Sequence, residues 1–147
     1  MYDEHIIMKQ KGYADILLGL QFGDEGKARV IDNLAKEYDI IARFNGGSNA
    51  GHTIEQGNIK ISLHQIPSGI FYPNTMLYIG SGCVVNIEKL ADEINTLKKI
   101  GVDVSHRLKI SGQASIVQPH HIALDTLLGK AIGTTKNGIG PAYADRA

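Results

Sequence analysis

A glycine-rich loop near the start of the chain carries residues that could bind a phosphate group. It runs from Gly19 to Lys27 and places the carboxylate of Asp24 in the same short loop as the amino group of Lys27. Glycines let backbone N–H groups turn toward a phosphate, the start of a following helix adds partial positive charge, and a lysine can reach terminal phosphate oxygens. The pattern favours phosphate binding, and a merely structural glycine turn explains it equally well.

This loop departs from the common phosphate-binding loop of nucleotide-hydrolysing proteins. Counted from Gly19, two extra residues precede Gly26 and Lys27, and Ala28 stands where a serine or threonine hydroxyl usually binds the metal. A magnesium ion would therefore need other oxygen ligands, of which Asp24 is the nearest candidate.

A second polar loop, Asn45 to Gly51 with the sequence NGGSNAG, is followed directly by His52. Glycine and asparagine tolerate positive φ and let the backbone approach a ligand closely. The alternative is a solvent-exposed loop with a surface histidine.

The elements around these loops predict an α/β fold. An apolar run from Ala14 to Leu20 predicts a buried strand, Glu25 to Tyr38 has helical spacing, and Asp39 to Phe44 predicts a second buried strand. A strand, helix and strand of this length imply a parallel pair with a right-handed crossover. Both polar loops would then follow strands of one mainly parallel sheet with flanking helices.

The rest of the chain extends this pattern with a β-hairpin, further strands and a second amphipathic helix. Asn86 is a candidate N-cap for that helix, and Gly101 a left-handed C-cap. The other elements expected are a hairpin at Thr53–Ile66, strands at Met76–Ile79, Leu108–Ile110 and Ser115–Val117, a short helix at Pro119–Leu128 and a loop at Gly129–Pro141. The apolar stripes expected to be buried are Val30, Ile31, Leu34, Ala35 and Tyr38 in the first helix, and Ile87, Leu90, Ala91, Ile94, Leu97 and Ile100 in the second.

Composition narrows the class of protein. The 147 residues suffice for one domain, which we expect at 13–147 after a disordered extension at 1–12. The formal net charge is zero, so we expect no nucleic-acid or membrane partner. Cys83 is the only cysteine, and the first residues lack the order of a signal peptide, which together favour a cytoplasmic protein.

Four sequence blocks resemble, in order, the amino-terminal motifs of the adenylosuccinate synthetases: Phe22–Asp32 (FGDEGKARVID), Arg43–Ile54 (RFNGGSNAGHTI), His64–Ile70 (HQIPSGI) and Ile132–Tyr143 (IGTTKNGIGPAY). The resemblance implies a GTP-dependent ligase of purine biosynthesis that joins IMP to L-aspartate through a 6-phosphoryl-IMP intermediate. It also implies Mg²⁺ and, at full length, a homodimer. The likeness covers well under half of the family's usual length, so we expect an incomplete enzyme. A noncatalytic GTP- and IMP-binding module and a dimerisation partner of a full-length synthetase are the alternatives.

The resemblance also assigns roles to individual residues. Asp24 matches the general base, His52 the acid, and Lys27 completes the catalytic set; Asp24 and the carbonyl of Gly51 match the metal ligands. The implied GTP contacts are Gly23, Asp24, Glu25, Gly26, Lys27, Ala28, Arg29, Gly51, His52 and Thr53. The implied IMP contacts are Asp24, Glu25, Gly26, Lys27, Asn49, Ala50, Gly51, His52 and Thr135.

Three residues depart from the family pattern. Ala28 and Arg29 replace glycine and lysine, and Asn137 stands where a basic residue is common. A methyl group at Ala28 could crowd a phosphate or oppose a positive φ.

The histidines His64, His106, His120 and His121 show no spacing that predicts a metal site.

Overall fold

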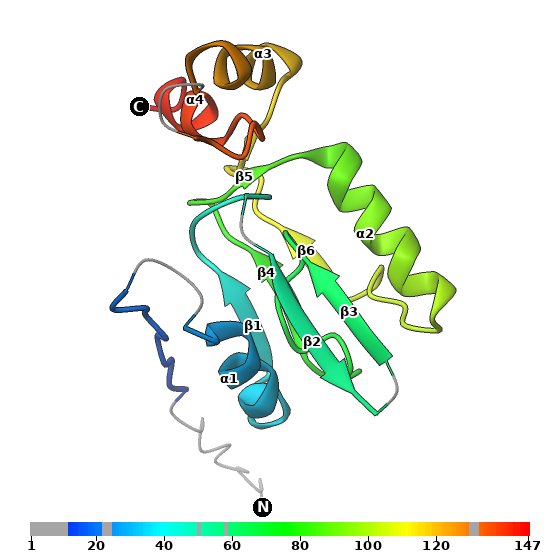
Figure 1. Cartoon of the computed structure of the whole chain (residues 1–147). Coiled ribbons are helices and arrows are strands. Elements are labelled where there is room, and N and C mark those ends of the chain that lie inside the picture. Colours follow the sequence, from blue (N-terminus) through cyan, green and yellow to red (C-terminus); the bar gives the residue numbers. More distant parts are fainter. Residues whose placement is uncertain (1–11, 22–24, 50, 58, 130–132) are drawn as a thin grey trace, which may run out of the picture.

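The computed structural model describes residues 12–21, 25–49, 51–57, 59–129 and 133–147. The elements are α1 (Lys27–Leu34), a 3-10 turn (Ala35–Glu37), β1 (Ile40–Arg43), β2 (His52–Gln56), β3 (Ile59–Leu63), β4 (Met76–Ile79), β5 (Val84–Val85), α2 (Ile87–Lys99), β6 (Leu108–Ile110), β7 (Ser115–Ile116), α3 (Pro119–Leu128) and α4 (Ile139–Ala144). Figure 1 shows the hairpin β2–β3 in front of the sheet and α3 with α4 beyond its upper end.

A parallel sheet of three strands in the order β1–β4–β6 forms the centre of the fold. Ile41 aligns with Leu77, and Leu77 with Leu108 in the next strand. Since β1, β4 and β6 agree with the strands expected from the sequence, the α/β class and the parallel sheet are confirmed.

The hydrophobic core lies between this sheet, the antiparallel hairpin and α2. Ile54 of β2 pairs with Ile61 of β3, and both are buried together with Ile41, Leu77 and Leu97 in one cluster. The expected hairpin is therefore confirmed, and its apolar face covers one face of the sheet.

Helix α2 begins and ends where capping residues predict. The side chain of Asn86 accepts a hydrogen bond from the backbone N–H of Lys89, and Gly101 has a φ of +82° just beyond the helix. The buried face differs from the expected stripe, because Ile87, Ala91 and Ile100 are exposed and Glu93 is buried. In the first helix Val30 and Leu34, also expected to be buried, are 43% and 39% exposed.

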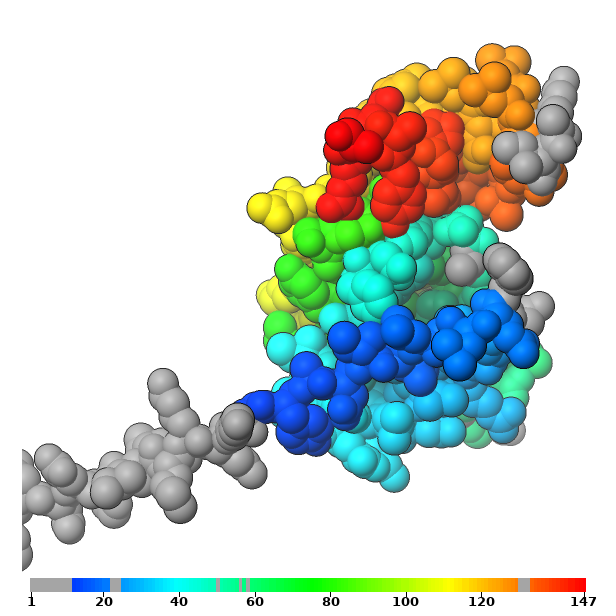
Figure 2. Space-filling view, turned by 90° about the vertical axis from the view of Figure 1, so that its left-hand side faces the viewer, coloured from blue at the N-terminus to red at the C-terminus, as the bar shows by residue number. Residues whose placement is uncertain are grey.

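The strand expected at Ala14–Leu20 is wrong. Residues 12–19 have no assigned secondary structure and join no described ladder, and Ile16, Leu18 and Leu20 are 73%, 63% and 97% exposed. Figure 2 shows this segment, in blue, as a raised strip below the orange and red residues of α3 and α4. An apolar run indicates the tendency to be buried in a sheet, but strand formation also needs a neighbour with free backbone groups.

The loop expected at Gly129–Pro141 is also shorter than predicted, because α4 begins at Ile139. Ala142 of α4 is buried against Val84 and Val117 in a second, smaller core. Packing of this short helix on α3 and β5 overrides the helix-breaking tendency of its glycine and proline.

One face of the parallel sheet is open to solvent in the described part of the chain. The alternate residues Ile40, Met76 and Tyr78 point away from the core and are 56%, 37% and 38% exposed. Parallel sheets are ordinarily covered on both faces by other elements. An apolar sheet face exposed to solvent is therefore unusual.

Candidate functional site

The carboxyl ends of the parallel strands hold the second glycine-rich loop in place. Gly46 forms a parallel bridge with Cys83, in the loop that follows β4. The hydroxyl of Tyr143, from α4, accepts from the N–H of Gly46 at 2.7 Å and donates to the carbonyl of Gly82 at 2.7 Å. This is the edge of an open α/β sheet at which ligands usually bind.

Arg43, the last residue of β1, joins this loop to the loop after the hairpin. Its guanidinium donates to the carbonyl of Gly47 at 3.2 Å and also to the carbonyl of His64. Burial lowers the pKa of Arg43, but a guanidinium stays charged at neutral pH. A fixed positive charge therefore lies between the two loops.

Glu93 positions the loop at His64–Ile66 from the buried side of α2. Its carboxylate accepts from the backbone N–H groups of His64, Gln65 and Ile66 at 3.0 to 3.2 Å. The side-chain amide of Gln65 exchanges two hydrogen bonds with the backbone of Asn86, at 2.9 and 2.8 Å. The first residues of the third sequence block are thus tied to α2 and to its N-cap Asn86.

His52, the first residue of β2, is a partly buried histidine. Its Nε2 is buried and has no hydrogen-bond partner among the described residues. Burial, followed by the charge of Arg43, lowers the pKa of His52 to about 4, and a hydrogen bond with the backbone of Ile66 opposes this shift. The imidazole is therefore neutral at neutral pH.

Gly51 lies beside His52 and close to the side chain of His64. A Cβ added there would come within 3.1 Å of the His64 ring. Asn49 and Thr135 are both exposed, as are Thr53 and Gly51. Ala50 lies outside the described residues.

The first loop is only partly described. Gly23 and Asp24 lie outside the described residues, so their predicted roles have no structural test. Gly26 has a φ of +74° and precedes α1, where Ala28 occupies a helical position. The expected conflict of Ala28 with a positive φ is therefore wrong, because Gly26 takes that conformation.

Lys27 and Arg29 both lie in the first turn of α1 and face different partners. The Nζ of Lys27 donates to the carboxylate of Glu25. The hydrogen bond and charge of Lys60 lower the pKa of Glu55 in β2, and the charge of Arg29 adds a smaller effect in the same direction. Helix α1 packs against β2, the strand that begins with His52. The structure thus brings the helix with Lys27 and the strand with His52 side by side (Figure 1).

Two cavities flank these elements. One of about 390 Å³ is lined by Glu25, Lys27 and residues 17–21. The other, of about 360 Å³, is lined by Ser48, Asn49, His64, Lys89, Asp92, Glu93, Asn137 and their neighbours. Asn49 and Lys27, both expected to contact IMP, line different cavities, and neither lining includes His52.

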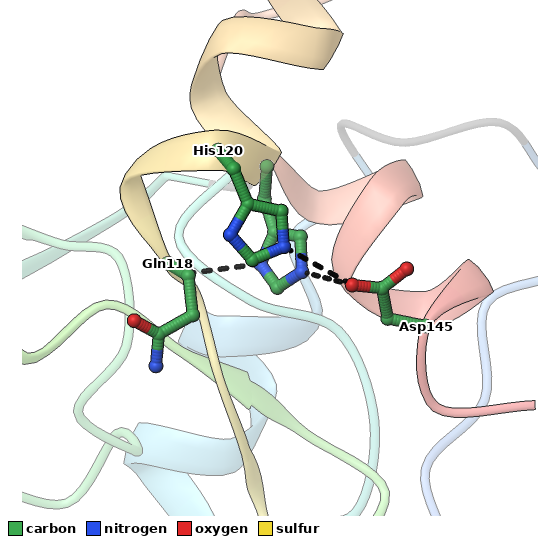
Figure 3. A network of polar contacts seen from close by, with 4 residues as sticks. Gln118, His120 and Asp145 are labelled. Atoms are coloured by element: carbon green, nitrogen blue, oxygen red, sulfur yellow. Dashed lines mark hydrogen bonds and ion pairs between the residues drawn. The ribbon is translucent and has the colours of Figure 1, made fainter.

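A cluster of His120, His121 and Asp145 joins α3 to the end of α4 (Figure 3). The Nε2 atoms of His120 and His121 lie 3.1 and 2.8 Å from one carboxylate oxygen of Asp145. The hydrogen bond with His121, then that with His120, lowers the pKa of Asp145. The sequence spacing gave no sign of this grouping, since Asp145 is 24 residues from His121.

The hydrogen bonds of His121 argue for a structural role of this cluster. Its Nδ1 accepts from the backbone N–H of Gln118 at 2.9 Å, so in the neutral ring the proton is on Nε2 and points to Asp145. A metal would need the lone pair at Nε2 and a proton on Nδ1. We therefore assign the cluster a structural role, in which its hydrogen bonds hold α3 to the end of α4.

Comparison with known proteins decides the family. The adenylosuccinate synthetase family model matches residues 16–147. The chain belongs to the adenylosuccinate synthetase family. It is 57% identical to adenylosuccinate synthetase 2 of Cupriavidus pinatubonensis over 136 residues, which cover 92% of this chain and 30% of that protein. It is 50% identical to the adenylosuccinate synthetase of Syntrophomonas wolfei over 135 residues, covering 90% of this chain and 32% of that protein.

Solved structures agree with this assignment. The fully ligated adenylosuccinate synthetase of Plasmodium falciparum matches with a TM-score of 0.78 and 42% identity, over 86% of this chain and 31% of that one. The succinoaminodeoxyadenylate synthetase of cyanophage S-2L, bound to dGMP and dATP, matches with a TM-score of 0.70 and 26% identity, over 86% and 35%. The chain thus spans about a third of the length of the relatives that it matches.

None of the helices in the described ranges combines the length and apolar composition that a membrane crossing requires.

Proposed function

We propose that this chain supplies the phosphate-binding and proton-transfer loops of a GTP-dependent ligase that converts IMP and L-aspartate to adenylosuccinate. Membership of the synthetase family supports the reaction. The observation that carries the local assignment is the buried Nε2 of His52, which has no hydrogen-bond partner in the part of the chain that the structure describes. A buried polar atom without a partner is costly in a folded protein, so a ligand is its natural partner.

The proposed reaction has two steps. Asp24 removes the proton from N1 of IMP, the electron pair shifts to the six-oxygen, and that oxygen attacks the γ-phosphorus of GTP while GDP leaves. The amino group of aspartate then attacks C6, inorganic phosphate leaves, and the nitrogen loses a proton. The products are adenylosuccinate, GDP and phosphate.

His52 would act as an acid only when an anion is present. The hydrogen bond with the backbone of Ile66 favours the protonated ring, so a ring N–H donates to it. Nε2 has no hydrogen-bond partner among the described residues, so a ligand atom can contact it. A phosphoryl oxygen beside Nε2 would raise the pKa of the ring and draw a proton onto it. Ligand binding is thereby coupled to the protonation that the acid role requires.

Asp24 and the carbonyl oxygen of Gly51 are the proposed ligands of Mg²⁺. Carboxylate and carbonyl oxygens suit this hard cation, and Gly51 is exposed to solvent. The bound ion would neutralise charge on the GTP phosphates. Lys27 and Arg29, at the start of α1, would bind the same phosphates directly.

Calorimetry tests this proposal. GTP with Mg²⁺, and separately IMP, would be titrated into the wild-type chain and into Lys27→Met and His52→Gln. We expect saturable binding that each variant weakens, with Lys36→Met, a substitution of the exposed lysine in the 3-10 turn, as the unaffected control. Absence of heat with both ligands in the wild type would contradict the proposal.

We further propose that the full-length protein is a cytoplasmic homodimer. The exposed apolar sheet face with Ile40, Met76 and Tyr78 favours association, either with a second copy or with further polypeptide of the family's length. Robust adenylosuccinate formation by these 147 residues alone would contradict the expectation that turnover needs more chain than this.

A further inference from the structure

The 360 Å³ cavity between α2 and the loop before α4 contains a lysine that none of the predicted roles includes. Lys89, in the first turn of α2, donates from its Nζ to the side-chain oxygen of Asn137. The amide nitrogen of Asn137 in turn donates to Thr135 Oγ1 at 3.1 Å and to the carbonyl of Ser48 at 3.4 Å. These contacts join three segments that are far apart in the sequence.

The position of Lys89 is unfavourable for the helix that carries it. A cation in the first turn lies at the positive end of the helix dipole, where acidic residues are preferred. Neither Asp92 nor Glu93, the two acids of this cavity, forms an ion pair with Lys89 in the described part of the chain. Glu93 is occupied by three backbone N–H groups, and Asp92 is exposed to solvent. The ammonium charge is therefore neutralised by no carboxylate there.

Ser48 supplies a second, independent sign of a missing ligand. Ser48 lines this cavity and is only 4% exposed. Its hydroxyl has no hydrogen-bond partner among the described residues. A buried hydroxyl without a partner costs free energy. A ligand oxygen in the cavity would satisfy it.

We infer that Lys89, Ser48 and Asn137 form a subsite for an anionic group, a phosphate or a carboxylate, in this cavity. Lys89 supplies the charge, the Ser48 hydroxyl donates a hydrogen bond, and Asn137 holds the lysine in place through its side-chain oxygen. The subsite itself is inferred from these contacts. The identity of its natural ligand, either the phosphate of IMP or a carboxylate of aspartate, rests on the proposed function.

The test uses inorganic phosphate and L-aspartate as separate probes, with ¹⁵N–¹H spectra reporting on the amides of Ser48, Asn49 and Asn137. We expect saturable shifts with at least one probe in the wild type. A charge-assisted hydrogen bond contributes enough for Lys89→Met to weaken that affinity about ten-fold or more. Lys99→Met, in the last turn of the same helix, should leave the affinity unchanged.

The outcomes separate this inference from the proposed function. No saturable shift with either probe, or shifts that Lys89→Met leaves unchanged, would overturn the subsite. IMP and inosine are then compared on the same variants. Loss of IMP binding but not inosine binding in Lys89→Met assigns the subsite to the phosphate, whereas a response to aspartate alone assigns it to the carboxylate. A wild type that binds phosphate or aspartate here, but neither IMP nor GTP, would keep the subsite and contradict the proposed function.

Discussion

The pH dependence of stability should reveal the unusual environment of His52. In an unfolded chain a histidine titrates near its ordinary pKa of 6.5, whereas the folded chain lowers the pKa of His52 to about 4. Between these values the unfolded state binds one more proton, so acidification stabilises it relative to the folded state. A shift of about 2.5 units corresponds to about 3 kcal/mol at 1.36 kcal/mol per unit. The free energy of unfolding should therefore fall by about 3 kcal/mol through this group as the pH drops from 6.5 to 4.

The measurement is chemical denaturation of the wild type and of His52→Gln near neutral pH and near pH 4, the lower end of this window. Other groups titrate in both proteins, so the difference between the two losses isolates His52. The wild type should lose about 3 kcal/mol more than His52→Gln. His106→Gln, which removes an exposed histidine, should behave like the wild type. Equal losses in the wild type and His52→Gln would refute the inference that His52 is held neutral.

Three further substitutions test contacts that position the loops, each by the free energy of unfolding. Glu93→Gln should lower the free energy of unfolding by about 3 kcal/mol, because an amide cannot accept all the backbone N–H groups that the carboxylate binds. The control Glu88→Gln, at an exposed position, should lower it by less than about 0.5 kcal/mol. Tyr143→Phe should cost about 2 kcal/mol, through the lost bonds with Gly46 and Gly82; a neutral result would mean that water replaces the hydroxyl. Gly47→Ala should cost about 1–3 kcal/mol, since the added methyl would lie 2.6 Å from Ile139 and 2.7 Å from Val84. Gly140→Ala, with open space in α4, should be neutral or stabilising, and the opposite order of these two variants would contradict the packing described.

Local signals explain why much of the fold could be predicted from the sequence. Helix α2 is framed by the N-cap Asn86 and the left-handed Gly101, and both signals act within a few residues of the helix ends. The hairpin has an alternating apolar face and a short polar turn. Capping and turn chemistry are local, so a single sequence is sufficient to reveal them.

The remaining differences come from contacts between distant segments. The run at Ala14–Leu20 has the composition of a buried strand, but composition does not supply a pairing partner. The burial of Glu93 depends on N–H groups 27 to 29 residues away. One signal could have found Glu93, since it lies between Leu90 and Leu97 on the buried side of α2. Nothing in the sequence placed Lys89 beside Asn137, 48 residues further on.

Amide hydrogen exchange with and without GTP and Mg²⁺ tests the central claim most directly. That claim is that two loops, the one entering α1 at Gly26–Arg29 and the one ending in Gly51–Thr53, bind a single set of phosphates. Because α1 packs against β2, we expect the nucleotide to slow exchange in both segments over the same range of concentration. Slower exchange in only one of the two segments at saturating nucleotide would contradict the account.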